Sequence, residues 1–226
     1  MKATASLKGG LTTTSTGFLP PDNSITAKYL RATKFKIGGW QLEAKRQVKV
    51  KYDTTAPSYD ELYGEEQRRK YEAILKELEK AKYKKVIDAG CGTGLLMEQL
   101  HDNCEHIVGI DISIGMLKIA KARLNRKVNA SLILADVENI PVKKGRFDLA
   151  LAITLIQNTP NPEKALRELK EKLNQNGTLV FTGMKKLFTA NELRRLAQSS
   201  QIKLVKLIDE KDAADIICIC TINNDV

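Results

Sequence analysis

The sequence predicts a doubly wound α/β fold built on a seven-stranded, mostly parallel sheet. Short apolar runs alternate with segments of helical periodicity from residue 66 to residue 222, and this alternation is typical of parallel strands joined by helical crossovers. The helical segments begin with recognisable capping residues, and neither a repeat nor a second α/β set occurs. One α/β domain is therefore expected, preceded by a basic N-terminal extension.

The individual elements can be placed from periodicity and capping residues. The expected strands span residues 85–89, 106–110, 131–135, 147–153, 177–182, 203–208 and 216–222, and the expected helices span 66–82, 95–100, 114–125, 162–173 and 190–199. Ser113 and Asn161 are suitable N-caps, and Thr189 with Glu192 predicts a capping box. Asn176-Gly177 is expected to end the helix at 162–173.

The charge distribution divides the chain into an extension, residues 1–51, and a domain, residues 52–226. Residues 1–51 hold ten Lys and Arg against two acidic residues, so most of the formal net charge of +10 lies there. A basic arm beside a nearly neutral domain indicates either a polyanionic partner or a solvated tail. Residues 1–24 are rich in Thr, Ser, Gly and Pro and predict a flexible segment, whereas residues 40–51 fit a short basic helix.

Composition argues against a membrane span, a secretory leader and a zinc site. No run of 18 apolar residues occurs, and the N-terminus has no apolar core typical of a signal peptide. The four cysteines include no C-x-x-C pair, and Cys218 and Cys220 are expected to share the core face of one strand. Free thiols without a disulfide framework indicate a reducing compartment, hence the cytoplasm.

A glycine-rich turn directly follows the first expected strand. Glycines stand at 90, 92 and 94, where they let the backbone turn tightly and approach a ligand. The spacing is one residue shorter than the dinucleotide fingerprint, and Asp88 precedes the first glycine by two residues. A carboxylate there would repel a pyrophosphate but would suit the ammonium and sulfonium groups of S-adenosylmethionine (SAM).

Two further acidic residues stand at the ends of the next two strands. Asp111 ends the second strand, where a carboxylate can accept hydrogen bonds from both ribose hydroxyls of an adenosine ligand. Asp136 follows the third strand, where an acid and a backbone amide can read the edge of adenine. Each aspartate alone would also fit a turn or a helix cap, but three acids at successive strand ends beside a glycine turn favour a ligand site.

These segments resemble the class I, seven-stranded SAM-dependent methyltransferases, in particular the branch that looks like quinone-biosynthesis enzymes. The resemblance covers about residues 52–223, and its most specific part is the segment at 86–94, Val-Ile-Asp-Ala-Gly-Cys-Gly-Thr-Gly. Residues 108–117 and 135–141 are similar to the family's next two motifs. The resemblance implies a Rossmann-like sheet whose last strand is antiparallel, and SAM as the cofactor.

The resemblance also implies a role for each matching residue. Gly90, Cys91, Gly92 and Gly94 would lie along the methionine and ribose, with Asp88 near the amino group; Asp111 would bind the ribose, Ile112 or Met116 would pack on adenine, and Asp136 with Val137 would read its edge. Tyr59 belongs to an entry segment, residues 52–60, whose tyrosines would close over the cofactor. Ordinary packing of a lead-in helix is the alternative for Tyr59.

The methyl acceptor is much less defined than the cofactor. Gln157 and Asn158 follow the fourth strand and could orient an acceptor, as could Tyr59, but no residue stands out as a catalytic base. His101 and His106 are expected to be structural or surface residues. Because the basic extension fits a polyanion and the site carries little lid, RNA or protein is the expected acceptor. A quinone or another small metabolite is the alternative, and a non-catalytic SAM-binding protein is a third reading.

Overall fold

The computed structural model describes residues 37–78, 81–124 and 129–222, so the predicted flexible segment 1–24 lies outside the described part. Seven strands form one sheet in the order β3-β2-β1-β4-β5-β7-β6. Their bounds are β1 (Tyr83–Ala89), β2 (Cys104–Asp111), β3 (Ala130–Leu134), β4 (Phe147–Ala152), β5 (Leu173–Met184), β6 (Lys203–Ile208) and β7 (Asp215–Thr221). The strands from β3 to β5 pair in parallel, and β7 is antiparallel to both β5 and β6. The predicted fold class is confirmed.

The helices lie close to their expected places, with two exceptions before the first strand. Their bounds are α2 (Ile37–Thr55), α3 (Tyr59–Leu78), α4 (Leu95–Leu100), α5 (Ile114–Leu124), α6 (Pro162–Lys172) and α7 (Ala190–Ser199), with short 3-10 turns η1 (Ala56–Ser58), η2 (His101–Asn103) and η4 (Ile156–Asn158). The exceptions are α2 and α3, which begin earlier than expected and almost meet. Helix α2 runs across the predicted boundary between residues 51 and 52, and that division stays a prediction.

The expected caps are present at three of the helices. Ser113 and Asn161 each accept a hydrogen bond from the backbone N–H three residues on, and Thr189 with Glu192 forms the predicted capping box. The expected stop at Asn176-Gly177 is wrong, because α6 already ends at Lys172 and Asn176 lies inside β5. There Phe147 of β4 pairs with Leu173, whereas Leu149 pairs with Thr178. Asn176 and Gly177 therefore lie in β5, where its pairing register with β4 shifts at a bulge or irregularity.

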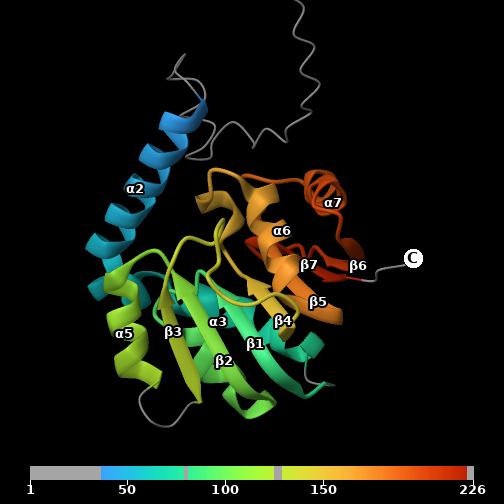
Figure 1. Ribbon diagram of the computed structural model, residues 1–226, viewed down its shortest axis with the longest axis horizontal. Coiled ribbons are helices and arrows are strands. Elements are labelled where there is room, and N and C mark those ends of the chain that lie inside the picture. The colour runs from blue at the N-terminus through green and yellow to red at the C-terminus, as the bar shows by residue number, and fades with distance from the viewer. Residues whose placement is uncertain (1–36, 79–80, 125–128, 223–226) are drawn as a thin grey trace, which may run out of the picture.

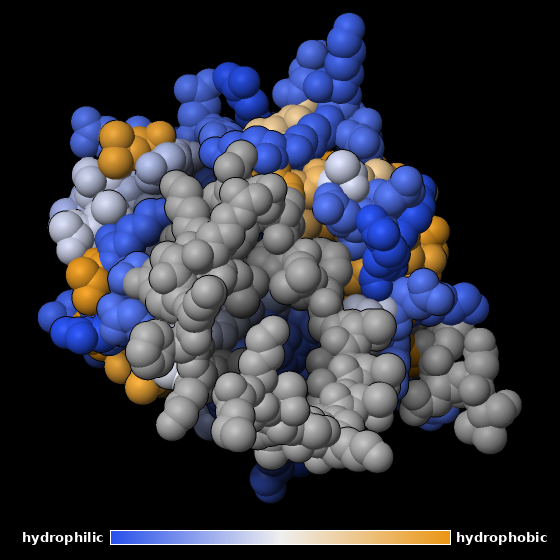
Figure 2. All heavy atoms as spheres, turned by 90° about the horizontal axis from the view of Figure 1, so that it is seen from above, coloured by the Kyte–Doolittle hydropathy of each residue, from blue (hydrophilic) through white to orange (hydrophobic). Residues whose placement is uncertain are grey.

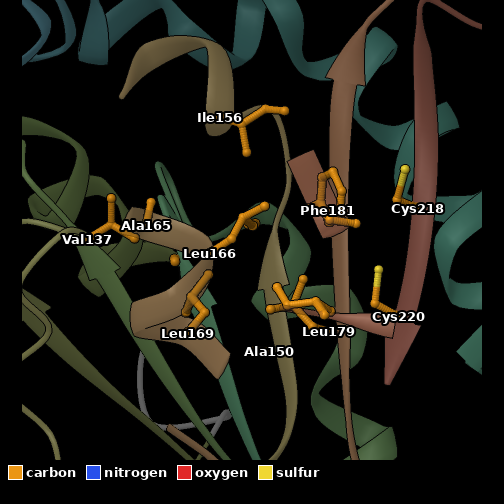
Figure 3. Packing of buried hydrophobic residues seen from close by; sticks show 14 of the residues in the cluster. Val137, Ala150, Ile156, Ala165, Leu166, Leu169, Leu179, Phe181, Cys218 and Cys220 are labelled. Atoms are coloured by element: carbon orange, nitrogen blue, oxygen red, sulfur yellow. The ribbon is translucent and has the colours of Figure 1, made fainter. Parts of the chain in front are cut away.

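Helices cover both faces of the sheet, which makes the fold doubly wound (Figure 1). One core cluster joins α6 and α7 to a face that includes Ile87, and the other joins α3, α4 and α5 to the opposite face that includes Val86. This alternation follows from the two-residue period of a strand. Cys218 and Cys220 are buried in the first cluster and point the same way from β7 (Figure 3), so the predicted core role is confirmed.

The surface of the described residues is mainly hydrophilic on the face shown in Figure 2, where hydrophobic residues form separate small groups. Within the described ranges, no helix combines the length and the apolar character that a membrane crossing requires.

Candidate functional site

A pocket opens at the carboxyl ends of β1 to β4, the edge where ligands bind in open parallel sheets. It contains about 940 Å³ of space between atoms, part of it open to solvent. The strand ends form its floor, while α2 and α3 contribute Lys45, Val48, Tyr52, Tyr59, Gln67 and Tyr71 to its walls. Among the described charged residues that line it, four are acidic and Lys45 alone is basic, so this part of the pocket suits a cationic ligand.

The glycine turn after β1 forms part of the pocket floor. Gly90 and Gly92 line the pocket and have φ angles of 73° and 53°. The backbone N–H groups of Gly90 and Cys91 both donate to the carbonyl of Ile110, at 2.7 and 3.0 Å, which ties the turn to β2. Cys91 lines the pocket as well. These three residues lie where the sequence places them.

Gly94 has a different place from the other two glycines. It precedes α4 with a φ of 78° and is not among the residues that line the pocket. A Cβ atom at Gly94 would lie 3.1 Å from the Cβ of Ala120, so its small size lets α4 pack closely against α5. Its expected contact with the cofactor stays a prediction, and the structure gives it a packing role.

Asp88 and Asp111 lie close enough to influence each other electrostatically. Asp88 is buried beneath the glycine turn, outside the pocket lining, and its burial together with the charge of Asp111 raises its pKa to about 7. Asp111 lines the pocket and accepts hydrogen bonds from the backbone N–H of Gly92 at 2.9 Å and of Ser113 at 2.8 Å. Burial raises the pKa of Asp111 despite these bonds. Asp111 thus holds the glycine turn as well as facing the ligand space.

The residues expected around adenine are together at one end of the pocket. Ile112, Met116, Asp136 and Val137 all line it, and Met116 and Val137 are almost completely buried. One carboxylate oxygen of Asp136 accepts from the backbone N–H of Glu138 at 2.9 Å. The site residues derived from the second and third strands are therefore brought to one place.

Lys45 is a pocket residue that sequence reasoning assigned to the basic extension instead. Its Nζ lies 2.6 Å from Asp136 Oδ2 and 2.7 Å from Glu138 Oε2. Burial lowers the pKa of Lys45, but the hydrogen bonds to the two carboxylates outweigh this effect and raise it overall. The spacing of Ala44, Val48 and Tyr52 at intervals of four could have indicated a helix face that packs on the domain and carries Lys45 with it.

Asp53 fastens the end of α2 to α5. Its Oδ1 accepts from the hydroxyl of Ser113 at 2.6 Å and from the backbone N–H of Gly115 at 3.0 Å, and Lys49 binds its other oxygen. The hydrogen bonds from Lys49 and Ser113 lower the pKa of Asp53 to about 2. A carboxylate at a helix N-terminus is also favoured by the helix dipole, so α2 is held by a charge at both ends of its contact with the domain.

The start of α3 is tied to the glycine turn by a second ionic group. Asp60 accepts from the hydroxyl of Thr93 at 2.6 Å and pairs with Arg123, whose Nε donates to the carbonyl of Thr93 at 2.9 Å. Tyr59 lies beside this group on the pocket wall, with its ring centroid 6.1 Å from that of Tyr52. Burial and the charge of Asp111 raise the pKa of Tyr59 to about 12. Tyr59 therefore faces the pocket, and its contact with the cofactor stays a prediction.

Of the two neighbouring acceptor-side candidates, Asn158 lines the pocket and Gln157 does not. Asn158 lines the pocket and donates to the carbonyl of Thr154 at 3.0 Å. Gln157 is buried and lies outside the pocket lining, and its amide has no hydrogen-bond partner within the described part of the chain. His101 follows α4 and His106 lies near the start of β2; neither is among the residues lining the pocket. The structure thus favours Asn158 over Gln157.

Comparison with known proteins agrees with the fold and the glycine turn. Residues 87–181 match the family described as "Methyltransferase domain". Together with the strand order, this match makes the chain similar to the class I, SAM-dependent methyltransferases, a family whose cofactor is SAM. The solved structure titled as the [4+2]-cyclase SpnF has a TM-score of 0.68 at 18% identity, with 75% of this chain and 77% of that chain covered, and so shares the fold.

Three curated relatives are similar to a longer part of the chain than the family model. An uncharacterized protein, MJ1252 of Methanocaldococcus jannaschii, is 37% identical over 61% of this chain and 52% of its own. A malonyl-[acyl-carrier protein] O-methyltransferase of Enterobacter lignolyticus is 31% identical over 76% and 63%. A demethylmenaquinone methyltransferase of Paenarthrobacter aurescens is 30% identical over 60% and 54%. The chain thus spans between about half and two thirds of the length of these relatives.

Proposed function

We propose that the protein transfers the methyl group of SAM to a small-molecule acceptor or to a small group presented on a carrier. The observation that carries this proposal is the cover over the pocket. Helix α2 contributes Lys45, Val48 and Tyr52 to the pocket lining, with Lys45 bound to Asp136 and Glu138, and α3 contributes Tyr59. The chain therefore supplies its own cover, and an acceptor that seals the site with its own bulk is not required.

The pocket residues suit methyl transfer without a strong base. The sulfonium methyl is already activated, so alignment of the acceptor and exclusion of water are the main demands on the protein. With a pKa of about 12, Tyr59 stays protonated at neutral pH and donates hydrogen bonds rather than accepting a proton. Asp60 is engaged by Arg123, and Asp136 by Lys45. These pairings favour an acceptor that is nucleophilic at neutral pH, such as a carboxylate or another ionised group.

The relatives support a small acceptor more than RNA or protein side chains. Their names specify a malonyl group on acyl-carrier protein and demethylmenaquinone. Residues 1–51 suggested a polyanion; within the described part of this segment, Lys45 and Lys49 are ion-paired and Lys51 lies over the ring of Tyr52. The expectation of an RNA or protein acceptor therefore gives way to the small-molecule alternative.

A second candidate is a protein that has the fold of the SAM-dependent methyltransferases but does not transfer the methyl group. The observation in its favour is the structural likeness to a protein titled as a cyclase, because a shared fold does not fix the reaction. The intact pocket chemistry at Gly92, Asp111 and Asp136 is compatible with either function.

The experiment that tests the proposal supplies methyl-labelled SAM to the full chain. Malonyl thioesters, demethylmenaquinone, the small-molecule fraction of a cell extract, its RNA and its protein are offered separately. We expect label in a small-molecule or carrier-bound product, and loss of that label in an Asp111→Asn control. Label in RNA or in protein side chains would refute the acceptor class. SAM binding without transfer to any fraction would favour the second candidate.

A further inference from the structure

A closed ring of buried polar groups lies where the pocket meets the space between α3 and β7. Lys70 of α3 places its Nζ 2.7 Å from Thr154 Oγ1 and 2.9 Å from Asp215 Oδ2. The hydroxyl of Thr182 donates to the same Asp215 oxygen at 2.9 Å and accepts from the backbone N–H of Thr154, also at 2.9 Å. The ring thus joins α3, the turn after β4, β5 and β7.

Each of the two threonine hydroxyls in this ring accepts one hydrogen bond and donates another. Thr154 accepts from Lys70 and is left free to donate to Gln67 Oε1 at 3.4 Å. Thr182 has one hydroxyl hydrogen, which it gives to Asp215, and it uses its lone pair for the N–H of Thr154. The side chains of Lys70 and Asp215 are 5% and 2% exposed, so solvent offers little substitute for these bonds. The other oxygen of Asp215, Oδ1, has no hydrogen-bond partner within the described residues, but the four groups of the ring bind one another and so restrict the local conformation.

Thr154 is the residue whose conformation depends on the ring. Its φ is 56°, and left-handed backbone is an outlier for a β-branched residue. Such a conformation persists only where the surroundings over-determine it. The other two non-glycine residues of positive φ in the described ranges, Asn176 and Gln201, are not β-branched and do not line the pocket.

The position of Thr154 gives this constraint a functional meaning. It follows β4 and lines the pocket next to Leu155, and its carbonyl accepts the hydrogen bond from Asn158. The sequence predicts that this turn, at the end of the fourth strand, is the acceptor side of the site. Gln67 faces the same pocket, whereas Lys70 and Asp215 line a second hollow between α3 and the connection from β6 to β7. The ring therefore forms a wall of the site on the acceptor side.

We infer that Lys70 is a positioning residue for methyl transfer: through Thr154 it fixes the acceptor-side wall of the pocket, at a distance from the SAM contacts of Gly92 and Asp111. This inference rests on the proposed function for its consequence in catalysis. Its structural part, that Lys70 and Asp215 hold the backbone of Thr154, can be tested without an acceptor. The two parts can therefore fail separately.

The test uses the full chain with a charge-balanced pair of substitutions, Lys70→Met with Asp215→Asn, because removing one charge alone would leave its buried partner uncompensated. Lys172→Met with Glu168→Gln is the matched control. Lys172 is also nearly buried and ion-paired to a carboxylate, but it lies on α6 and does not line the pocket. Circular dichroism checks the fold of both variants, and calorimetry measures SAM binding.

The first readout is exchange of the Thr154 amide hydrogen with solvent. We expect it to be about tenfold or more faster in the Lys70/Asp215 variant than in the wild type, because the bonds that hold its acceptor are lost, and unchanged in the control. The SAM dissociation constant should stay within about twofold of the wild type in both variants. Unchanged exchange at Thr154, or loss of SAM binding equal to the loss of activity, would overturn the inference.

The second readout is steady-state kinetics with the acceptor that takes label. We expect kcat/KM for the acceptor to fall about tenfold or more in the Lys70/Asp215 variant, with KM for SAM unchanged, and a partial return in Lys70→Arg, which restores the charge. An equal fall in the control pair would show that buried ion pairs matter only for stability, and would also overturn it. If no acceptor takes label, the proposed function fails while the exchange measurement still decides the role of Lys70.

Discussion

Gly92 offers a clean test of the cofactor site, because the structure contains a matched control for it. Gly92 and Gly145 both have positive φ, 53° and 63°, and a Cβ added at either would meet no heavy atom within 4 Å. Replacement by alanine should therefore cost each protein the same backbone strain, about 1–2 kcal/mol. For a domain of this size that corresponds to a melting temperature lowered by roughly 2–8 °C. Gly92 lines the pocket, whereas Gly145 lies in the loop before β4.

Calorimetric titration with SAM, after thermal unfolding of both variants, separates strain from ligand contact. We expect Gly92→Ala to weaken SAM binding by at least about tenfold, or about 1.4 kcal/mol, since the new methyl group occupies open space at the pocket. Gly145→Ala should bind SAM like the wild type. Equal affinities in the two variants would refute the placement of the cofactor along the glycine turn, and unequal melting temperatures would refute the claim of equal strain.

Three further predictions concern charged groups of the site. Asp111→Asn should weaken SAM binding by about 1.5–3 kcal/mol, because hydrogen bonds to a charged acceptor are lost; an unchanged dissociation constant by calorimetry would contradict this. Asp88, with a pKa near 7 from burial and from the charge of Asp111, holds its proton more tightly in the folded state, so the ligand-free protein should lose stability as pH rises from about 4 to 7. Cationic SAM should bind roughly tenfold more weakly at pH 6 than at pH 8, and both trends should be clearly weaker in Asp88→Asn, where only the raised pKa of Asp111 remains. Lys45→Met should destabilise the protein by about 1.5–3 kcal/mol in urea unfolding by stranding the buried Glu138, whereas the exposed neighbour change Arg46→Met should stay within about 0.5 kcal/mol.

The positions of the strands and of most helices along the chain could be predicted because their signals are local. A strand buried on both faces is a short apolar run, and caps such as Asn161 and Thr189 stand next to the helices they begin. The irregular start of β5 could not be predicted, because Asn176-Gly177 is a turn signal by itself and becomes a bulge only through pairing with β4. Tertiary pairing overrode local preference there.

The site residues likewise divide into those with a local sequence signal and those that only the tertiary structure brings together. Asp111, Asp136 and the glycine turn could be predicted, because the carboxyl ends of parallel strands meet at one edge of a sheet. The sequence does not distinguish a residue at that edge that lines the pocket, such as Gly92, from one beneath it, such as Asp88. Lys70 could not be identified, because its partner Asp215 is 145 positions further along the chain and has meaning only once α3 lies on the sheet.

The basic charge near the N-terminus shows why a count of charges does not identify a partner. A segment binds a polyanion through cations that release counterions from phosphates, and a cation already paired inside the protein contributes little to that release. Lys45 lies between two carboxylates, and Lys49 binds Asp53. The Lys45 pairs attach α2 to the domain, whereas the Lys49 pair lies within α2 and holds Asp53, which in turn binds Ser113 of the domain. Two of the ten basic residues that suggested an arm for RNA are therefore used inside the protein, whereas the six at positions 2 to 36 lie outside the described residues.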